Sequence, residues 1–502
     1  MSPIQSKGVA TSGVFGKLWD GATSLLRNSM ISSLKGTITT GYLTIIDETG
    51  ATHEDINVNS RDAVDETLRA DFTVKDEIFW WRVAGTESLG VGEAFMYDEF
   101  ETSDIAKLLK VLALNRPAAA TYSLVPQPLW NLMEYLRGVI YYWTVARNDS
   151  RGGSEKNVKE HYDIGNELFE GFLDETMTYS CPIFPGMAPQ PSSLNTDTAT
   201  STAEDDETIC SDRMPSPPPE TSSPPQKPVP LPYLRSYPVP PSSLLAQAQT
   251  AKLRRLIHLS GFRPGDRVVE IGSGWGSMSL ELTALGAKHV TTLTLADEQA
   301  AVVRGRCDEK VVKCEVIDYR KYADKCEEPF DRLVSCEMIE AVGKEFLAEY
   351  FAKIDKLVHP IHGAAAIQFI SIPDSRYNEY VTGGPDYINK HIFPGGHLPS
   401  LTSFVEAVYQ GTSGRLIVDE ANQIGPHYAV ALRMWRERFL ANFDQIAPIK
   451  PSLYTPIFRR KWEFYFAFCE AGFETGRLGI YQVRLCREGR LGQWGQLART
   501  IA

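Results

Sequence analysis

The sequence predicts an α/β protein with a parallel sheet covered by helices on both faces, preceded by a smaller α+β unit. Beyond residue 243, short apolar runs of strand length alternate with segments of helix length, the pattern of repeated β-α units. The expected strands are Arg267–Ile271, Val290–Leu295, Val311–Ile317, Arg332–Cys336 and Ala364–Ile370, with helices at Ser277–Leu285 and Ala300–Cys307. In such sheets a ligand binds beyond the carboxyl ends of the strands.

The composition excludes several classes of protein. The chain has 502 residues, of which 43% are hydrophobic and 23% charged, so it has ample material for buried cores. No run approaches the roughly 18–20 consecutive apolar residues that cross a bilayer, and the start lacks a secretory signal pattern. The 8 cysteines have no metal-binding spacing and suit reduced thiols in the cytoplasm. A net charge of −12 disfavours broad nucleic-acid binding.

Residues 1–120 are expected to form the smaller α+β unit, which is expected to face the lipid or membrane. Apolar residues recur at helical spacing over 15–31, and this helix is expected to pack within its own domain, with a position on a membrane surface as the alternative. Strand-like runs follow at Gly41–Ile46 and Glu77–Val83, and the segment 104–115 predicts a short helix. Residues 121–184 are expected to supply a helical lid and the start of the larger domain, which resumes over 244–502.

Residues 185–243 are predicted to be a disordered insertion. Nearly half of the 31 prolines fall here, among Ser, Thr, Asp and Glu. Such a segment buries too little apolar surface to offset the entropy lost on ordering, so a surface spacer is the preferred interpretation. Phosphorylation sites or polyproline ligands for a partner are the alternative.

The run Val268–Gly276, VVEIGSGWG, places a glycine-rich turn directly after an expected strand. Its spacing is GxGxG, whereas GxGxxG is the spacing that seats a pyrophosphate on a helix N-terminus. Glu270 stands just before the turn, where it would repel a diphosphate. Both features favour a ligand with a cationic or neutral group, such as the amino acid moiety of S-adenosylmethionine (SAM).

Two further strand ends offer polar groups to such a ligand. The second strand ends in Thr294 and Leu295, with Gln299 one turn later, where a carboxylate would more commonly hold the ribose hydroxyls. The third strand ends in Asp318 and Tyr319, and Asp318 is a candidate acceptor for an adenine amino group.

Several separated stretches resemble the cyclopropane-fatty-acyl-phospholipid synthase family, which includes the mycolic acid cyclopropane synthases. They occur in family order over about 152–487 and are interrupted only by the insertion. The stretches are HYDIGNELFEGFLDETMTYSCPIF (161–184), AQTAKL (248–253), VVEIGSGWGS (268–277), TLTLADEQ (292–299), FDRLVSCEMIEAVG (330–343), IQFISIPDSRY (367–377), NKHIFPGGHLPS (389–400) and HYAVALRMWRERF (427–439).

The resemblance implies a Rossmann-like class I SAM-dependent methyltransferase that adds a methylene to a cis double bond of a phospholipid acyl chain. It assigns Cys181, Glu340 and Tyr428 to holding a bicarbonate ion, with Gln368 where the family often has histidine. Together with the reasoning on the glycine turn, it predicts a cofactor-binding set. That set is Tyr179, Ser180, Glu270, Gly272, Gly274, Trp275, Gly276, Thr294, Leu295, Gln299, Asp318 and Tyr319.

The chemistry explains why an anion is expected. Methyl transfer to an alkene leaves a carbocation, and ring closure removes one proton from the new methyl. A side-chain carboxylate beside the cation risks alkylation, whereas a small anion held by hydrogen bonds is a movable base. Glu340 is then an orienting residue, and water must be kept out because it would quench the cation.

The expected partner is an unsaturated phospholipid in a bilayer, which implies peripheral membrane contact by a cytoplasmic enzyme; a homodimer is left open. The basic and aromatic run 457–466 fits an interfacial patch, but an amphipathic packing helix is preferred. Four alternatives remain. They are methyl branching without ring closure, methylation of a sphingolipid base, a catalytically inactive lipid- or SAM-binding protein, and a nicotinamide-dependent oxidoreductase, which the glycine spacing disfavours.

Overall fold

A computed structural model describes residues 14–49, 52–57, 68–115, 164–187 and 243–489, apart from some side chains. The larger domain is built on a 7-stranded sheet in the order β10-β11-β9-β8-β5-β6-β7. Strands β5 to β9 run parallel, and β11 is antiparallel to both of its neighbours. The strands are β5 (Arg267–Ile271), β6 (His289–Thr294), β7 (Val312–Val316), β8 (Arg332–Cys336), β9 (Ala364–Ser371), β10 (Leu416–Gln423) and β11 (Gly479–Arg487). This arrangement confirms the predicted α/β class.

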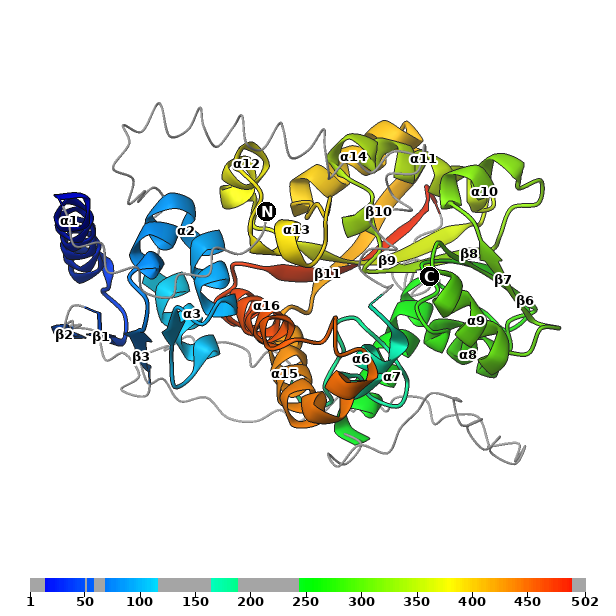
Figure 1. Ribbon diagram of the computed structural model, residues 1–502. Helices are drawn as coiled ribbons and strands as arrows, with labels where there is room; N and C mark the ends of the chain where they lie inside the picture. Colours follow the sequence, from blue (N-terminus) through cyan, green and yellow to red (C-terminus); the bar gives the residue numbers. More distant parts are fainter. Residues whose placement is uncertain (1–13, 50–51, 58–67, 116–163, 188–242, 490–502) are drawn as a thin grey trace, which may run out of the picture.

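Helices cover both faces of this sheet (Figure 1). One layer contains α7 (Ser243–Leu259), α8 (Ser277–Ala284) and α9 (Asp297–Arg306), and the other contains α10 (Tyr319–Lys325), α11 (Leu347–Leu357) and α14 (Leu401–Thr412). Neighbouring residues of β8 alternate between the two layers: Leu333 belongs to the core under α11, and Val334 belongs to the core under α7. A strand buried on both faces reads as a continuous apolar run, which is why β5 and β8 were predictable.

The N-terminal unit contains a 4-stranded sheet in the order β2-β1-β3-β4. Its elements are α1 (Val14–Thr37), β1 (Tyr42–Asp47), β2 (Thr52–Asn57), β3 (Arg69–Val74), α2 (Ile78–Met96), β4 (Phe100–Glu101) and α3 (Ile105–Asn115). The expected helix over 15–31 corresponds to α1, and its Leu26, Met30 and Ile31 are buried. None of the helices in the described part of the chain is long and apolar enough to span a membrane.

The prediction of a strand at Glu77–Val83 is wrong, because this segment forms the first turns of α2. Aromatic and β-branched residues favour strands. Here, however, the Asp76 carboxylate accepts a hydrogen bond from the backbone N–H of Ile78 (2.9 Å), the first residue of α2, and so stabilises the start of the helix. Phe79 and Trp80 are then buried, at 5% and 0% exposure. Tertiary burial therefore outweighs the local propensity.

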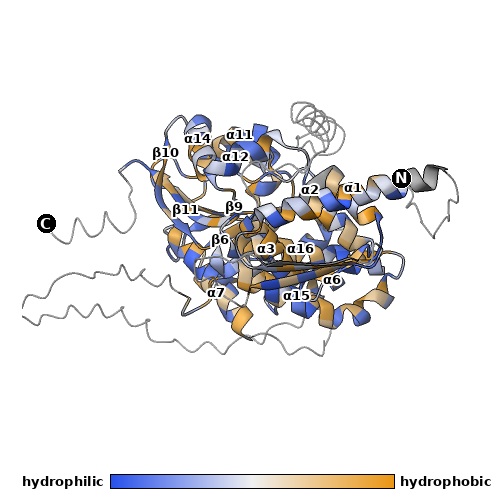
Figure 2. Cartoon of the chain, turned by 90° about the vertical axis from the view of Figure 1, so that its left-hand side faces the viewer, coloured by the Kyte–Doolittle hydropathy of each residue, from blue (hydrophilic) through white to orange (hydrophobic). Residues whose placement is uncertain are grey.

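The N-terminal unit and the larger domain share one apolar core. Helix α16 (Pro456–Glu474) packs against α2, α3 and α15 (Pro426–Ile446), and Figure 2 shows apolar residues gathered around α3 and α16. The basic and aromatic run 457–466 lies within α16, with Phe458 and Trp462 buried, so the packing-helix interpretation is confirmed. Gly92 lets α2 approach closely, because a Cβ there would lie 2.2 Å from the Tyr387 ring.

Shorter helices complete the fold: α6 (Asn166–Phe172), α12 (Asp374–Thr382) and α13 (Tyr387–His391). The predicted boundary at 120 and nearly all of the predicted insertion, over 188–242, lie outside the described residues. The division of the chain into 1–120, 121–184, 185–243 and 244–502 therefore stays a prediction.

Candidate functional site

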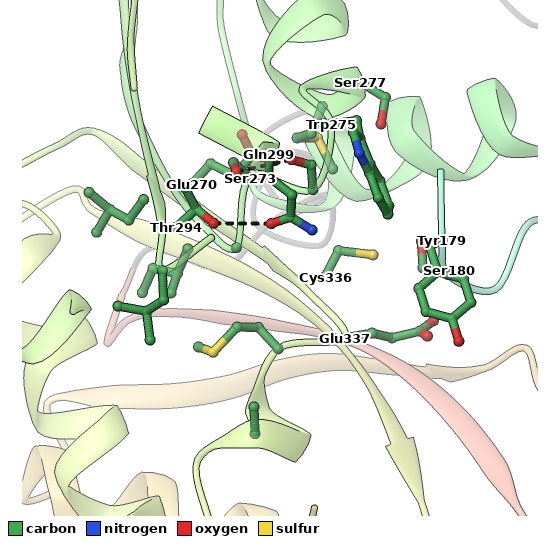
Figure 3. A pocket seen from close by; sticks show the side chains of 18 of the residues that line it. Tyr179, Ser180, Glu270, Ser273, Trp275, Ser277, Thr294, Gln299, Cys336 and Glu337 are labelled. Carbon is green, nitrogen blue, oxygen red and sulfur yellow. Dashed lines mark hydrogen bonds between the residues drawn. The ribbon is translucent and has the colours of Figure 1, made fainter. Parts of the chain in front are cut away.

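A pocket opens at the carboxyl ends of β5, β6 and β8, where the sequence predicted a ligand. It is lined by the glycine turn, by the segment after α6, by α7 and by the loop after β8. All 12 residues of the predicted cofactor-binding set except Gly276 line it. Figure 3 shows Glu270, Thr294 and Gln299 at one end and Glu337, Tyr179 and Ser180 at the other.

The glycine turn requires its glycines for conformational reasons. Gly272 has φ of 93° and Gly274 has φ of 48°, which side-chain-bearing residues rarely adopt. A Cβ on Gly274 would meet no atom within 4 Å, so the backbone here faces open space in the pocket. Gly276 does not line the pocket but caps α8 at φ 90°. The turn thus exposes backbone to the pocket, and the binding of a ligand there stays a prediction.

Glu270 is the buried acid at the base of the pocket, with 4% of its surface exposed. Its carboxylate accepts a hydrogen bond from Ser279 Oγ (2.7 Å). Burial raises the pKa of Glu270 to about 7, against the lowering effect of this hydrogen bond. A ligand cation would restore the charged form, so the site suits an ammonium group.

At the end of β6, Thr294 Oγ1 donates a hydrogen bond to Gln299 Oε1 (3.0 Å) (Figure 3). This bond uses the amide oxygen of Gln299 and leaves its NH2 group as the donor that faces the pocket. Leu295 lines the pocket beside them. The sequence correctly grouped these residues, and the structure gives the polar pair a fixed orientation.

Asp318 is engaged more strongly than the sequence suggested. Its carboxylate forms a salt bridge with Arg320 (2.6 Å) and caps α10 by accepting from the backbone N–H of Arg320 (2.8 Å). Lone pairs remain for one further donor, so recognition of an adenine amino group stays a prediction. Tyr319 lines the pocket and packs edge-on against Tyr350.

The segment after α6, which includes Tyr179 and Ser180, forms one wall of the pocket. Tyr179 and Tyr465 share a hydrogen bond between their hydroxyls (2.7 Å), and the Trp275 indole donates to Asn166 (2.8 Å). Helix α7 fixes the segment through Gln249, whose amide donates to the Ser180 carbonyl (2.8 Å). His161, Tyr162 and Asp163, the first residues of the family-like stretch 161–184, lie outside the described residues.

Three of the four predicted catalytic residues converge on a carboxylate that sequence reasoning did not single out. Glu337 Oε1 accepts from the backbone N–H of Cys181 (2.8 Å) and from the side-chain amide of Gln368 (2.7 Å). Glu337 Oε2 accepts from the hydroxyl of Tyr428 (3.0 Å). These are the donors that the resemblance assigned to bicarbonate, so an ion would have to displace Glu337 to use them.

Glu337 follows β8 directly and has φ of 50°, a left-handed conformation that is rare for residues with a side chain. Such strain persists only where surrounding structure enforces it, and it is typical of functional sites. Burial raises the pKa of Glu337, while its hydrogen bonds to Cys181, Gln368 and Tyr428 lower it. The available sequence signal was an acid placed immediately after a buried strand.

Glu340, the fourth predicted catalytic residue, faces elsewhere. Its Oε1 accepts from the backbone N–H of Ile370 (2.5 Å), and its buried Oε2 has no hydrogen-bond partner among the described residues. Burial, and then repulsion from Glu337, raise the pKa of Glu340 to about 8. Glu340 is therefore held as a neutral acid at pH 7, beside the carboxylate that meets the donors.

The chain matches the family model described as mycolic acid cyclopropane synthetase, over residues 150–198 and 233–483. It is 34% identical to the tuberculostearic acid methyltransferase UfaA1 of Mycobacterium tuberculosis, over 80% of this chain and 79% of that protein. It is 27% identical to the cyclopropane-fatty-acyl-phospholipid synthase of Escherichia coli, over 85% of this chain and 90% of that protein. The solved cyclopropane synthase MmaA2 of M. tuberculosis has a TM-score of 0.48 at 23% identity, covering 66% of this chain and 98% of that one.

Proposed function

The chain belongs to the mycolic acid cyclopropane synthetase family, and we propose that it methylates the cis double bond of an unsaturated phospholipid acyl chain. SAM supplies the electrophilic methyl group. The residues that would hold it are the predicted cofactor-binding set, of which Glu270, the glycine turn and the Thr294–Gln299 pair have the clearest chemistry. The proposed product is a cyclopropane fatty acid.

The observation that carries this proposal is the placement of Glu337. Its carboxylate lines the same pocket as the glycine turn, and its side chain points toward Tyr179 and Ser180 (Figure 3). Once a methyl group has added to the alkene, the acyl chain carries a cation, and one proton must leave the new methyl. Glu337 is half-buried, and its place in the pocket lining suits it to accept that proton.

We assign the role of the base to Glu337 in place of a bound bicarbonate. The hazard of a side-chain carboxylate is that it alkylates, and three hydrogen bonds reduce that hazard because they occupy its lone pairs and restrict its motion. The Gln368 amide is itself oriented by Gln482, whose Nε2 donates to Gln368 Oε1 (2.8 Å). Cys181 contributes its backbone N–H, and burial raises the pKa of its thiol well above the usual range.

The surroundings of Glu337 suit a reaction that water would spoil. Cys181 and Gln368 are 0% exposed and Tyr428 is 4% exposed. The ring of Tyr428 packs against Trp435 and Phe473. A dry, aromatic wall favours proton loss from a carbocation over capture by water.

A methyl-transfer assay on phospholipid vesicles tests the proposed reaction. Purified protein with SAM and vesicles of a dioleoyl phospholipid should yield a fatty acid heavier by one CH2 that resists hydrogenation, measured by gas chromatography and mass spectrometry. No transfer of labelled methyl from SAM to the lipid would reject lipid methylation. A product of the same mass that can be hydrogenated still contains a double bond. That result would reject ring closure but would leave lipid methylation supported.

Methyl branching is the second candidate, and the 34% identity to a tuberculostearic acid methyltransferase favours it. In that reaction a hydride shifts from the methylated carbon to the neighbouring cationic carbon, and the methyl then loses a proton, which leaves a C=CH2 branch on the open chain. Glu337 would accept the same proton in both reactions. The hydrogenation step of the vesicle assay separates the two products.

Peripheral membrane contact belongs to the same proposal, because the acyl chains of a phospholipid lie within a bilayer. Among the described residues, α1 leaves Leu25 74% exposed and Trp19 44% exposed. Sedimentation of the protein with anionic and neutral vesicles tests this contact, and recovery of all protein in the supernatant would contradict it.

A further inference from the structure

A buried lysine shares the pocket with Glu270 and has no part in the reaction derived above. Lys252 lies on α7, is 0% exposed and lines the pocket. Its Nζ donates to Ser180 Oγ (2.6 Å) and lies 3.5 Å from Cys336 Sγ. Burying an ammonium group among neutral partners is costly, so an anionic partner at this position would be strongly stabilising.

That anionic partner is not supplied by the described residues. No carboxylate oxygen of the described part of the chain lies within the 4.0 Å that defines a salt bridge to Lys252. Burial raises the pKa of both Glu270 and Glu337, and the positive charge of Lys252 opposes that rise only in part. The pocket thus contains a buried cation and a buried acid at its base that do not pair with each other.

Resting on the proposed use of SAM, we propose that Lys252 binds the carboxylate of the cofactor's methionine moiety, while Glu270 receives its ammonium group. The methionine moiety is a zwitterion, and a pocket with one buried charge of each sign is complementary to it. Ser180 supports the same contact. Its oxygen accepts from Lys252, so its own hydroxyl proton is available for the second carboxylate oxygen.

The competing role for Lys252 is structural. Lys252 and Gln249 lie three residues apart on α7, so they share a face of the helix, and both hold the lid segment: Gln249 Nε2 donates to the carbonyls of Thr178 (3.1 Å) and Ser180 (2.8 Å). A purely structural lysine would affect every ligand of the pocket equally. A carboxylate-binding lysine affects only ligands that carry the carboxylate.

Isothermal titration of the full-length protein with S-adenosylhomocysteine and with its decarboxylated analogue separates the two roles without any turnover. The wild-type protein should bind S-adenosylhomocysteine about 30-fold or more tightly than the analogue, as expected for a buried charge pair. Equal affinities in the wild-type protein would overturn the proposal, and this measurement needs no variant.

Lys252→Met should remove the preference, lowering affinity for S-adenosylhomocysteine about 30-fold while leaving the analogue bound equally or more tightly. The matched control is Gln249→Leu, which loosens the lid segment without changing the charge of the pocket, and should weaken both ligands by the same factor. If Lys252→Met behaves like Gln249→Leu, the lysine is structural and the proposal is wrong. Because only binding is read, failure of lipid methylation would leave this result unaffected.

Discussion

The hydroxyl of Tyr428, on α15, donates a hydrogen bond of 3.0 Å to the carboxylate of Glu337, at the end of β8. This contact joins the helical layer to the carboxyl-terminal edge of the parallel strands across 91 residues of sequence. Burial raises the pKa of the Tyr428 hydroxyl well above its usual range, so it remains a donor. The Tyr428 hydroxyl therefore stays protonated and donates to Glu337, whose carboxylate is the acceptor of this hydrogen bond.

Glu337→Gln should lower turnover strongly while preserving the fold, because an amide retains the shape of the side chain but accepts no proton. General-base catalysis contributes about 10²–10⁴-fold, and kcat should fall by that factor. The measurement is transfer of labelled methyl from SAM to oleoyl phospholipid vesicles. A variant within threefold of wild type would remove Glu337 from the reaction.

Glu337→Gly tests whether the side chain stands in for a bound ion. Glycine accepts φ of 50° without strain, and its missing carboxylate leaves the Cys181, Gln368 and Tyr428 donors open to an anion. Activity should be lost in bicarbonate-free buffer and return in a saturable way as bicarbonate is added. The wild-type enzyme should be insensitive to bicarbonate, and chloride at equal ionic strength should rescue neither protein. Strict dependence of the wild type on bicarbonate would instead support a bound ion as the base.

Gln368→Glu should shift the pH dependence of turnover. Gln368 is 0% exposed and donates to Glu337, so a carboxylate there replaces a donor with a second negative charge. The pKa of Glu337 then rises, and the acidic limb of the kcat–pH profile should move to higher pH. Gln482→Leu is the control, because it removes the anchor of Gln368 without adding charge and should lower kcat without moving that limb. An unmoved limb in Gln368→Glu would contradict the assignment of Glu337 as the titrating base.

The parallel part of the fold was predictable because each β-α repeat is local in the sequence and the inner strands β5, β6 and β8 are buried on both faces, although the edge strand β7 is only partly buried. Strands β10 and β11 were not predicted. The burial pattern of β10 is mostly partial, and β11 pairs with β9 only through tertiary contact. At Glu77–Val83 the same local reasoning failed. The segment forms a helix because tertiary packing buries Trp80, and local sequence preference does not report that packing.

The site was predictable to a similar degree. Motif positions identified the donors Cys181, Gln368 and Tyr428, but not the acceptor that they meet. Glu337 and Glu340 both follow β8, and the carboxylate that reaches the donors is determined by the left-handed φ of Glu337. No periodicity or spacing reports a single backbone dihedral angle, so this choice required coordinates.

Glu340→Gln should act mainly on stability. Burial in the folded protein raises the pKa of Glu340 to about 8, whereas the usual pKa of a glutamic acid side chain is 4.5. The contribution of Glu340 is therefore fully present below pH 4.5 and is lost as the pH rises toward 8, by at most about 1.4 kcal/mol per pH unit. Glutamine imitates the neutral acid, so urea unfolding between pH 5 and 8 should show a flatter decline of stability than in wild type. Its kcat at pH 7 should exceed that of Glu337→Gln at least tenfold, on the order expected for losing an orienting contact rather than the base. Identical pH slopes in the two proteins would show that Glu340 is already ionised.

Gly92→Ala should destabilise the contact between the N-terminal unit and the larger domain. The added Cβ would lie 2.2 Å from the ring of Tyr387 and 2.8 Å from that of Phe464, both within the shared core. Overpacking of this kind costs about 1–3 kcal/mol, which outweighs the better helix propensity of alanine. Gly21→Ala is the matched control, since Gly21 also lies within a helix but its Cβ would meet no atom within 4 Å. Urea unfolding should therefore show a loss of stability at position 92 and a gain of up to about 1 kcal/mol at position 21. Equal effects at both positions would mean that α2 does not pack against Tyr387 as closely as described.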